Sequence, residues 1–375
     1  MSEISFLGVG DVLIDRPDPR TMFTHVAEVL QAADITFANC EQMYSDRRDH
    51  PVSRHPSPSD PGTIDALEFA GFDVLSLANN HTMDWGGNAL VDTVSRLRGR
   101  GFETVGAGAD LGEARKPVIV EAKGVKVGFL AYGSTGPEDY AAGAGSPGYA
   151  PVHAWTKYEK LDNQAGTPPR VRSGAKPDEL AAMAEDVKAL KEQCHAVVVS
   201  FHWGIHFLPR VIPDYCHEIG HAAVDAGADL VLGTHPHILK GIETYRGKVI
   251  FYSTSNFSLE LTSDYLNDDS AAEALDRLQK LYGVRPDPEY PTYPMPPESK
   301  ASIIVKASIS GDGIERVGFV PAYINREAEP EIVGQLDPRG QEVFDYLRSV
   351  TDSEGLTCVF RWYGDEVVID TTVSV

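Results

Sequence analysis

The chain contains a series of polar residues of the kinds that bind metal ions. They are Asp11, Asn39-Cys40-Glu41, Asn79-Asn80-His81, His202, His235 and His237. Carboxylates combined with neutral imidazoles favour Zn, Mn or Fe, whereas a set of oxygen ligands alone would favour Ca or Mg. The candidates outnumber the ligands of a single tetrahedral ion, so the series predicts one or two divalent ions, a pair being bridged by a carboxylate. Such ions activate water and stabilise negative charge on a scissile group, which indicates hydrolysis.

Each polar segment follows a short apolar run that is typical of a buried strand. These runs are Ile4–Gly10, Ile35–Asn39, Asp73–Leu77, Ala196–Phe201 and Asp229–Leu232. Helical patterns alternate with them at 22–33, 63–70, 89–98, 178–193 and 215–226. This alternation predicts an α/β fold in which helices cover the faces of one sheet. Because the strand carboxyl ends of such a sheet share one edge, we expect the polar residues to converge there.

The remaining patterns predict two hairpins, a C-terminal helix and two irregular stretches. The hairpins lie at 118–132 and 302–322, a further strand at 248–253, the helix at 341–350 and a final β pair at 357–370. Residues 133–177 are rich in Gly, Pro and Ala, and 262–300 end in a Pro-dense segment, so we expect lids, binding loops or disordered segments. We therefore predict one large domain, 1–325, with insertions at 133–177 and 262–300. A C-terminal extension, 326–375, would pack on the same domain.

The polar segments also form an ordered series of short motifs. The series is GD at 10–11, NCE at 39–41, LANNHTMDWG at 77–86, HWG at 202–204, GTHPH at 233–237 with Glu243 after it, and YSTSNF at 252–257. In this order the motifs resemble the CapA family of poly-γ-glutamate capsule biosynthesis proteins. The domain of that family is related to the calcineurin-like metallophosphoesterases. The resemblance covers roughly residues 4–325.

The resemblance implies a four-layer α/β sandwich of the metallophosphatase type, with mixed sheets, outer helices and a metal site at the strand ends. It implies that Asp11 binds one ion and that Glu41 bridges two. The other ligands would be Asn80, His202 and His235 on the second ion and His237 on the first. His81 would match the histidine that acts as general acid. Asp84 would orient His81 or cap the helix that follows it.

Two departures from the family pattern affect the predicted site. Metallophosphoesterases usually carry Asp-x-His at the first strand, whereas Val12 and Leu13 follow Asp11 here, which leaves the number of ions open. The family motif HWG.E reads HWGIH, so His206 replaces a carboxylate and is a candidate ligand or substrate contact. Four histidines outside the motifs are predicted to be structural, namely His25, His195, His217 and His221.

A cluster of basic residues follows Glu41 and suggests how a charged substrate could be held. Arg47, Arg48 and Arg54 could anchor an anion, because arginine pairs bidentately with carboxylate or phosphate. A solvated loop in which Asp46 and Asp49 pair with these arginines is the alternative. Trp203 could line a substrate pocket, although packing in the core is the more common use of tryptophan.

Charge narrows the range of partners. The 375 residues include 33 Lys and Arg against 55 Asp and Glu, a formal net charge of −22. Nucleic acids and anionic membranes require a basic surface, so we expect neither as a partner and a small molecule as the substrate. No pattern indicates an oligomeric state.

The N-terminal residues lack the basic, apolar and small-residue segments of a secretory signal. No window approaches the apolar length of a membrane helix. The four cysteines are too few and too scattered for a disulfide framework. We therefore expect a cytoplasmic protein with free thiols.

Together these features predict a metal-dependent hydrolase. Metal-activated water would attack an amide or a lactone or other ester bond of a small acidic molecule, with His81 assisting the leaving group. One alternative is a phosphoesterase of the metallophosphatase type. Another is a non-catalytic protein that binds polyglutamate or takes part in capsule assembly.

Overall fold

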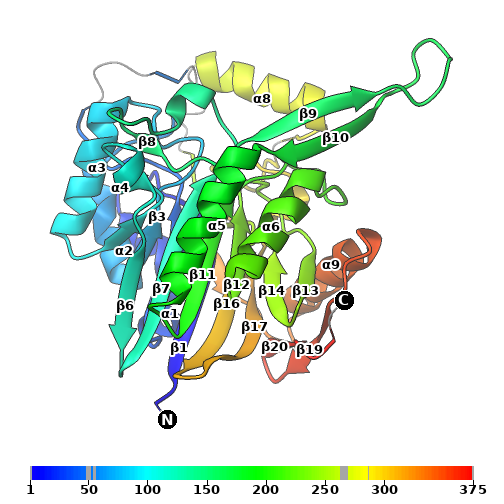
Figure 1. Ribbon diagram of the computed structural model, residues 1–375. Coiled ribbons are helices and arrows are strands. Elements are labelled where there is room, and N and C mark those ends of the chain that lie inside the picture. The colour runs from blue at the N-terminus through cyan, green and yellow to red at the C-terminus, as the bar shows by residue number, and fades with distance from the viewer. Residues whose placement is uncertain (1, 48–51, 54–55, 262–268, 286, 374–375) are drawn as a thin grey trace.

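Two mixed β-sheets form the centre of the computed structural model, which describes residues 2–47, 52, 53, 56–261, 269–285 and 287–373 (Figure 1). The larger sheet consists of β1 (Ile4–Leu13), β2 (Ile35–Cys40), β3 (Val74–Ser76), β4 (Glu103–Val105), β15 (Asn256–Leu259), β16 (Ala301–Ser310), β17 (Gly313–Ile324), β18 (Pro330–Ile332), β19 (Val359–Tyr363) and β20 (Glu366–Asp370). Its main path runs β19-β20-β17-β16-β1-β2-β3-β4, while β15 pairs with β1 and β18 with β17. Strands β1 to β4 are parallel, and β16 turns the sheet antiparallel.

The smaller sheet has six strands. They are β6 (Val118–Ala122), β7 (Val125–Gly133), β11 (Ala196–His202), β12 (Leu230–Thr234), β13 (Ile242–Tyr245) and β14 (Lys248–Phe251), in the order β13-β14-β12-β11-β7-β6. The prediction that all strands share one sheet is therefore wrong. Strand periodicity reports only that a segment is buried, and it does not report which of two stacked sheets the segment joins.

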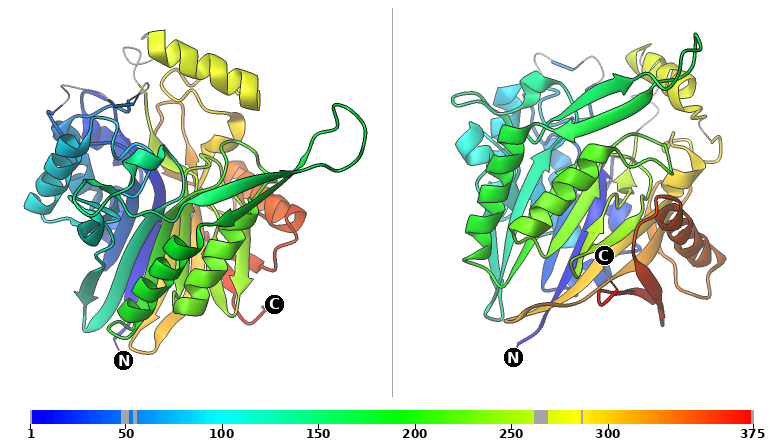
Figure 2. Two further views of the ribbon diagram at one scale, coloured as in Figure 1. Left: turned by 45° about the horizontal axis from the view of Figure 1, so that its top comes forward. Right: turned by 45° about the vertical axis from the view of Figure 1, so that its right-hand side comes forward.

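The two sheets pack face to face, and helices cover their outer faces. Between the sheets, the rings of Phe6 and Phe37 lie 6.0 and 6.1 Å from the ring of Phe129. Helices α1 (Ala27–Gln31), α2 (Ile64–Ala70) and α3 (Gly87–Gly99) belong to the layer beside the larger sheet, and α5 (Pro177–Lys191) and α6 (Asp214–Ala226) cover the smaller one (Figures 1 and 2). The predicted four-layer α/β sandwich is confirmed.

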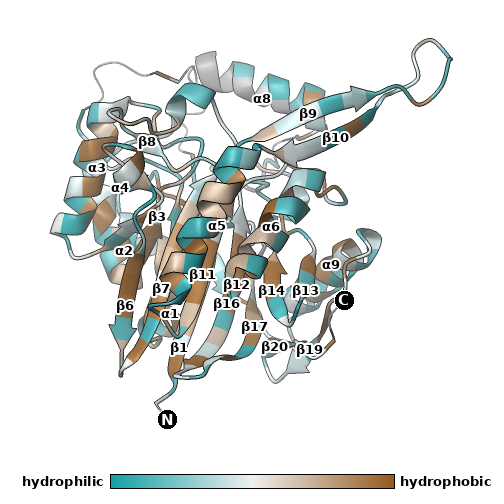
Figure 3. Ribbon diagram, in the orientation of Figure 1, coloured by the Kyte–Doolittle hydropathy of each residue, from teal (hydrophilic) through white to brown (hydrophobic). Residues whose placement is uncertain are grey.

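Burial of apolar side chains accounts for this layering. Figure 3 shows apolar residues concentrated in the central strands and polar residues on the outer sides of the helices. Local signals set helix limits: Pro177 is the first residue of α5, and Gly71 ends α2 with a φ of 83°, in the left-handed region that favours glycine. In the described part of the chain, no helix has the length and apolar character needed to cross a membrane.

The remaining helices are short or lie at the edges of the sandwich. They are α4 (Leu111–Ala114), α9 (Pro338–Ser353) and the 3₁₀ helices η1 (Pro19–Phe23), η2 (Pro61–Thr63), η3 (Glu138–Tyr140) and η4 (Pro297–Lys300). Helix α9 contacts β13 as well as β16 and β17, and so touches both sheets. The helix predicted at 22–33 is broken into η1 and α1, because Thr24 and Val26 donate to carbonyls three residues back.

Both stretches that we expected to be loops contain regular structure. Residues 133–177 include β9 (Ala154–Glu159) and β10 (Arg170–Ala175), which form a hairpin, and β8 (Gly148–Tyr149), which pairs with β5 (Ala107–Gly108). Helix α8 (Asp269–Tyr282) lies within 262–300. The hairpin projects from the body of the molecule, and α8 lies at the same end, opposite the N-terminus (Figure 2). No side chain of β9 is buried, and in β10 only Gly174 and Ala175 are, so these strands lack the alternation that reveals a strand.

Candidate metal centre

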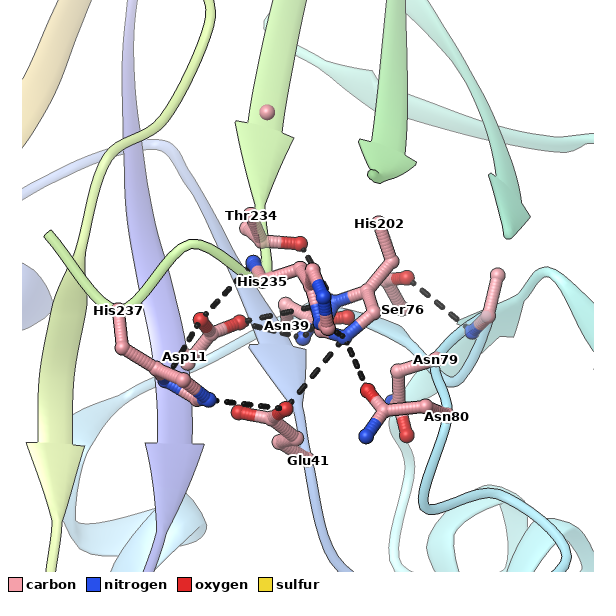
Figure 4. A network of polar contacts seen from close by, with 12 residues as sticks. Asp11, Asn39, Glu41, Ser76, Asn79, Asn80, His202, Thr234, His235 and His237 are labelled. Carbon is pink, nitrogen blue, oxygen red and sulfur yellow. Dashed lines mark hydrogen bonds and ion pairs between the residues drawn. The ribbon is translucent and has the colours of Figure 1, made fainter. Parts of the chain in front are cut away.

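The predicted metal ligands converge where the two sheets meet at their carboxyl ends (Figure 4). The larger sheet contributes Asp11 in β1, Glu41 directly after β2 and Asn80 after β3. The smaller sheet contributes the ligands His202 at the end of β11, and His235 and His237 after β12. The site is therefore assembled from both sheets, with an equal share from each.

One group of potential ligands consists of Asp11, Glu41 and His237, whose donor atoms lie within 4.8 Å of one another. His237 Nε2 lies 3.7 Å from Glu41 Oε1, and His237 Nδ1 lies 3.7 Å from Asp11 Oδ2. The Nδ1 atom is also 2.7 Å from Asn256 Oδ1, an arrangement in which Nδ1 donates and the Nε2 lone pair is free for an ion.

A second group consists of Glu41, His202 and His235, with Asn80 beside it. His202 Nε2 lies 3.4 Å from Glu41 Oε1, 2.5 Å from Asn80 Oδ1 and 3.2 Å from His235 Nδ1. The other ring nitrogen of His202 contacts Thr234 Oγ1 at 2.9 Å. Nitrogen and oxygen donors thus surround a common point, as they do around a bound cation.

Glu41 belongs to both groups, and the surroundings of its carboxylate test whether a divalent metal ion fits the site. Both of its carboxylate oxygens are buried, and neither has a hydrogen-bond partner among the described residues. A buried carboxylate without hydrogen-bond partners is costly, and a bound cation would offset that cost. Carboxylate, amide and imidazole donors together suit Mn, Zn or Fe.

The pKa values of the two carboxylates shift in opposite directions. Although burial opposes ionisation, the adjacent His237 and His202 lower the pKa of Glu41 to about 2. Burial and the charge of Glu41 raise the pKa of Asp11 well above its ordinary value. In the metal-free site, negative charge therefore resides on Glu41, which both groups of potential ligands share.

The backbone at the site is held in uncommon conformations. His235, His237 and Ser255 have positive φ angles of 95°, 56° and 65°, which non-glycine residues adopt only at an energetic cost. A Cβ at Gly10 would lie 1.9 Å from the carbonyl oxygen of Ser255, so only glycine fits before Asp11. The Asp11 N–H donates to that same carbonyl at 3.1 Å.

His81 is held by Asp84 beside the two groups. His81 Nδ1 lies 2.7 Å from Asp84 Oδ2, which also accepts from the Ser57 N–H at 2.6 Å. Helix α3 begins after Gly86 and has no side-chain cap, so Asp84 orients His81 and does not cap this helix. Burial opposes protonation of His81, but the contact with Asp84, together with Glu41 and Asp11, raises its pKa to about 9.

Of the predicted substrate contacts that the structure describes, only His206 lies at this centre. Its ring is 4.1 Å from that of His235 and 5.2 Å from that of His237, and its Nε2 is buried without a hydrogen-bond partner among the described residues. Burial and His237 lower the pKa of His206 to about 3, so the ring is neutral. Tyr282 at the end of α8 contacts the His206 ring edge-on at 6.2 Å, which brings the 262–300 insertion to the site.

Comparison with known proteins establishes the family. Residues 5–260 match the family described as "Bacterial capsule synthesis protein PGA_cap". The chain belongs to this family. The PGA biosynthesis protein CapA of Bacillus subtilis is 27% identical over 260 residues, 66% of this chain and 61% of that protein. A "Probable polyglutamine synthesis accessory protein" of Mycobacterium tuberculosis is 32% identical over 267 residues, 68% of this chain and 63% of that protein.

The chain thus spans less than two thirds of the length of these relatives. Among solved structures, one described as a novel phosphatase from Mycoplasma pneumoniae matches with a TM-score of 0.49 and 13% identity, covering 92% of this chain and 99% of that chain.

Trp203, in the HWG motif, lies in the core and not at the candidate metal centre. Trp203 is fully buried against Phe201, at a ring distance of 4.7 Å, in the core between the smaller sheet and its helices. Successive side chains of a strand point to opposite faces, so the residue after the site-facing His202 points away from the site. The proposed substrate contact of Trp203 is wrong.

The arginines predicted to anchor an anion are only partly described. The side chain of Arg47 is 61% exposed, and its Nε lies 3.9 Å from Asp92. This exposed ion pair with Asp92 fits the alternative of a solvated loop; Asp46 pairs with Arg96, and Asp49 lies outside the described residues. Arg48 and Arg54 lie outside the described residues.

Sequence reasoning assigned no role to the residues that orient the candidate ligands, although it included Asn39 in the polar series. Asn39 donates to Asp11 Oδ1 at 2.7 Å, and Asn256 and Thr234 contact His237 and His202. All three lie inside PGA_cap motifs, which is the signal that could have identified them. Tyr293, in the 262–300 insertion, accepts from Asn256 Nδ2 at 2.8 Å and carried no such signal.

Proposed function

We propose that this chain is a metal-dependent hydrolase that cleaves an amide or ester bond, lactones included, in a small acidic molecule. The observation that carries the proposal is Glu41, a buried carboxylate without hydrogen-bond partners in the described structure, shared by two groups of potential ligands. Divalent ions held there would activate water and neutralise the negative charge that develops during hydrolysis.

The chain's own residues supply the remaining chemistry. Asp84 fixes the His81 ring, whose side chain is 26% exposed, so substrate can reach it. An amine leaves an amide only after it takes up a proton, and a histidine fixed in this way is suited to donate that proton. His206 would contact the substrate as a neutral ring from the opposite side of the ligand set.

The relatives favour an amide over a phosphate ester. The name of the Mycobacterium protein refers to polyglutamine, a polymer whose units are joined by amide bonds. The family name refers to capsule synthesis. We propose an amide-linked substrate on this basis, with a phosphoesterase or a non-catalytic polyglutamate-binding protein as the outcomes that the following experiment would reveal.

The test combines metal analysis of the purified protein with activity assays on amides, lactones and p-nitrophenyl phosphate. Wild type, Asp11→Ala and His237→Ala would be compared, with His25→Ala as the matched control, because His25 is 45% exposed and pairs with Glu329 away from the site. We expect metal-stimulated turnover of an amide or lactone in wild type and His25→Ala, lost in the other two variants.

Turnover of the phosphate ester alone would favour a phosphoesterase. Protein without bound metal and without metal-stimulated turnover of any substrate would contradict the hydrolase proposal and favour a binding role.

A further inference from the structure

A separate cluster of metal-binding side chains lies on the outer face of the smaller sheet. His217 and His221 lie one turn apart on α6, and Glu243 lies on the edge strand β13. Each offers one donor atom, and these atoms lie within 4.8 Å of one another. We predicted both histidines to be structural, because the sequence places no companion beside them. The tertiary fold brings that companion, Glu243, to them.

Hydrogen bonds around Tyr252 place the ring proton of His217 on its Nδ1 atom. The Tyr252 hydroxyl donates its single proton to Glu243 Oε2 at 2.6 Å. His217 Nδ1, 2.8 Å from the same hydroxyl, must then be the donor to it. With Nδ1 protonated, the Nε2 atom of His217 carries a free lone pair, which is the form of imidazole that binds a metal ion.

His221 and Glu243 already stand close to the spacing of two ligands of one ion. His221 Nε2 is 2.9 Å from Glu243 Oε2, and the His221 ring is fixed by stacking on Tyr245 at 3.9 Å. Ligands of a tetrahedral zinc ion, at about 2.0–2.2 Å from the metal, lie about 3.3–3.5 Å apart. The ion would replace the proton between the two groups, and the pair would open by a few tenths of an ångström.

We propose that His217, His221 and Glu243 form a zinc-binding site distinct from the candidate metal centre. Two imidazoles and one carboxylate suit zinc, whereas Ca and Mg prefer oxygen ligands. The side chains of His221 and Glu243 are 32% and 13% exposed, so an ion can enter from solvent. The contact between Tyr252 and Glu243 supplies the supporting hydrogen bond that metal ligands commonly have.

The position of the zinc site indicates that the ion has a structural role. It joins α6 in the outer helical layer to β13 at the edge of the smaller sheet. The Tyr252 ring stacks on Trp203 at 5.8 Å, and the Tyr252 carbonyl oxygen accepts from the Trp203 indole N–H at 2.9 Å. Trp203 directly follows the candidate ligand His202. The zinc site therefore supports the side of the sheet opposite to the candidate metal centre.

Zinc titration of the full chain, with bound metal counted after equilibrium dialysis, tests the proposal. It would be carried out in wild type and in the Asp11→Ala variant, so that loss of ions from the candidate metal centre is counted separately. In both backgrounds we expect His221→Ala to remove one equivalent of zinc. We expect Glu243→Gln, which retains an acceptor for Tyr252, to weaken zinc binding by at least about tenfold.

His195→Ala is the matched control, because His195 accepts from the Lys126 N–H outside both sites and should leave the zinc count unchanged. Circular dichroism of each metal-free variant checks the fold. If His221→Ala fails to fold, Glu243→Gln and His217→Gln decide the question. Unchanged zinc stoichiometry and affinity in the folded variants would overturn the proposal. The cluster would then be a set of hydrogen-bonded side chains that does not bind zinc.

Discussion

At the scale of single residues, Glu41 and Asp11 show how the site uses charge. The two carboxylates are both buried in the same centre, yet only Glu41 belongs to both groups of potential ligands. Burial and Glu41 disfavour a second negative charge on Asp11, while His237 and His202 favour the charge on Glu41. A bound cation would supply the compensation that Asp11 lacks in the metal-free site.

Replacing Glu41 by Gln should weaken both metal binding and the stability of the metal-free chain. We expect Glu41→Gln to reduce bound metal at both groups and to lower turnover by about 10²-fold or more, because the shared anionic ligand is lost. Thermal unfolding with a chelator present should also show a lower midpoint than that of wild type, because His237 and His202 stabilise the charge of Glu41 in the folded chain.

Glu179→Gln is the control for the Glu41 variant, because Glu179 also pairs with a histidine, His153, but lies outside the site. It should leave metal content and turnover unchanged. A Glu41→Gln variant with wild-type metal content would show that Glu41 does not bind the ions.

His81 should matter for turnover and not for metal binding. His81→Ala removes the proton donor that Asp84 holds, so we expect turnover of an amide to fall by about 10²-fold while metal content stays at the wild-type level. Measuring both quantities on the same preparation separates the two roles. Loss of metal from this variant would identify His81 as a ligand instead.

At the scale of elements, the loop between β11 and α6 carries His206 and is tied down by Lys240. The Lys240 ammonium is buried and donates to the carbonyl oxygens of Leu208 and Val211. On its other side, this part of the site is covered by Tyr282 of α8. The position of His206 therefore depends on a buried lysine and on an insertion, both distant in sequence.

Lys240 should make stability rise with pH. Burial lowers its pKa from 10.5 to about 8, so between these values the unfolded chain binds more protons than the folded chain. The free energy of unfolding should therefore increase from pH 8 toward 10.5, by an amount on the order of 3 kcal/mol, and should not change below pH 8 on this account. The difference between wild type and Lys240→Met in urea unfolding at pH 7.5 to 10 measures this contribution.

Lys157→Met is the control for this pH series, because Lys157 is 67% exposed on the hairpin. Its difference from wild type should stay constant with pH. An equally constant difference for Lys240→Met would mean that the buried ammonium does not shift its pKa as described.

At the scale of the whole molecule, the candidate metal centre lies at the junction of the two sheets. Asp11 in the larger sheet accepts from the His235 N–H of the smaller sheet at 3.1 Å, so the sheets are linked there even without an ion. A site whose ligands come from both sheets would be complete only in the folded chain, so the ion would bind only to the folded chain. Metal binding should therefore stabilise the whole sandwich.

Urea unfolding with Mn²⁺ can count the ions. At one hundred times the dissociation constant, one ion should add about 2.7 kcal/mol to the free energy of unfolding, and two independent ions about twice that. His237 belongs to one group only, so His237→Ala should keep the gain of the other ion. His25→Ala should keep the full gain. Equal unfolding curves with Mn²⁺ and with chelator would contradict metal binding at the junction.

Much of this molecule could be predicted from its sequence because the relevant signals are local. The strands before Asp11, Glu41 and His202 are contiguous apolar runs, and the ligands follow them directly. The order of the motifs identified the family, and the family implied the four-layer fold. The predictions of a helix at 22–33 and of loops at 133–177 and 262–300 were wrong in detail, because short or exposed elements have weak periodicity.

The sequence by itself determined the types of the candidate ligands, their order along the chain and the alternation of strands and helices. Only the tertiary structure decided that the strands form two sheets, that Glu41 is shared by two groups and that Trp203 points away from them. It also brought Glu243 to His217 and His221. The physical reason is that periodicity depends on neighbouring residues, whereas these contacts depend on how buried faces far apart in the chain pack against each other.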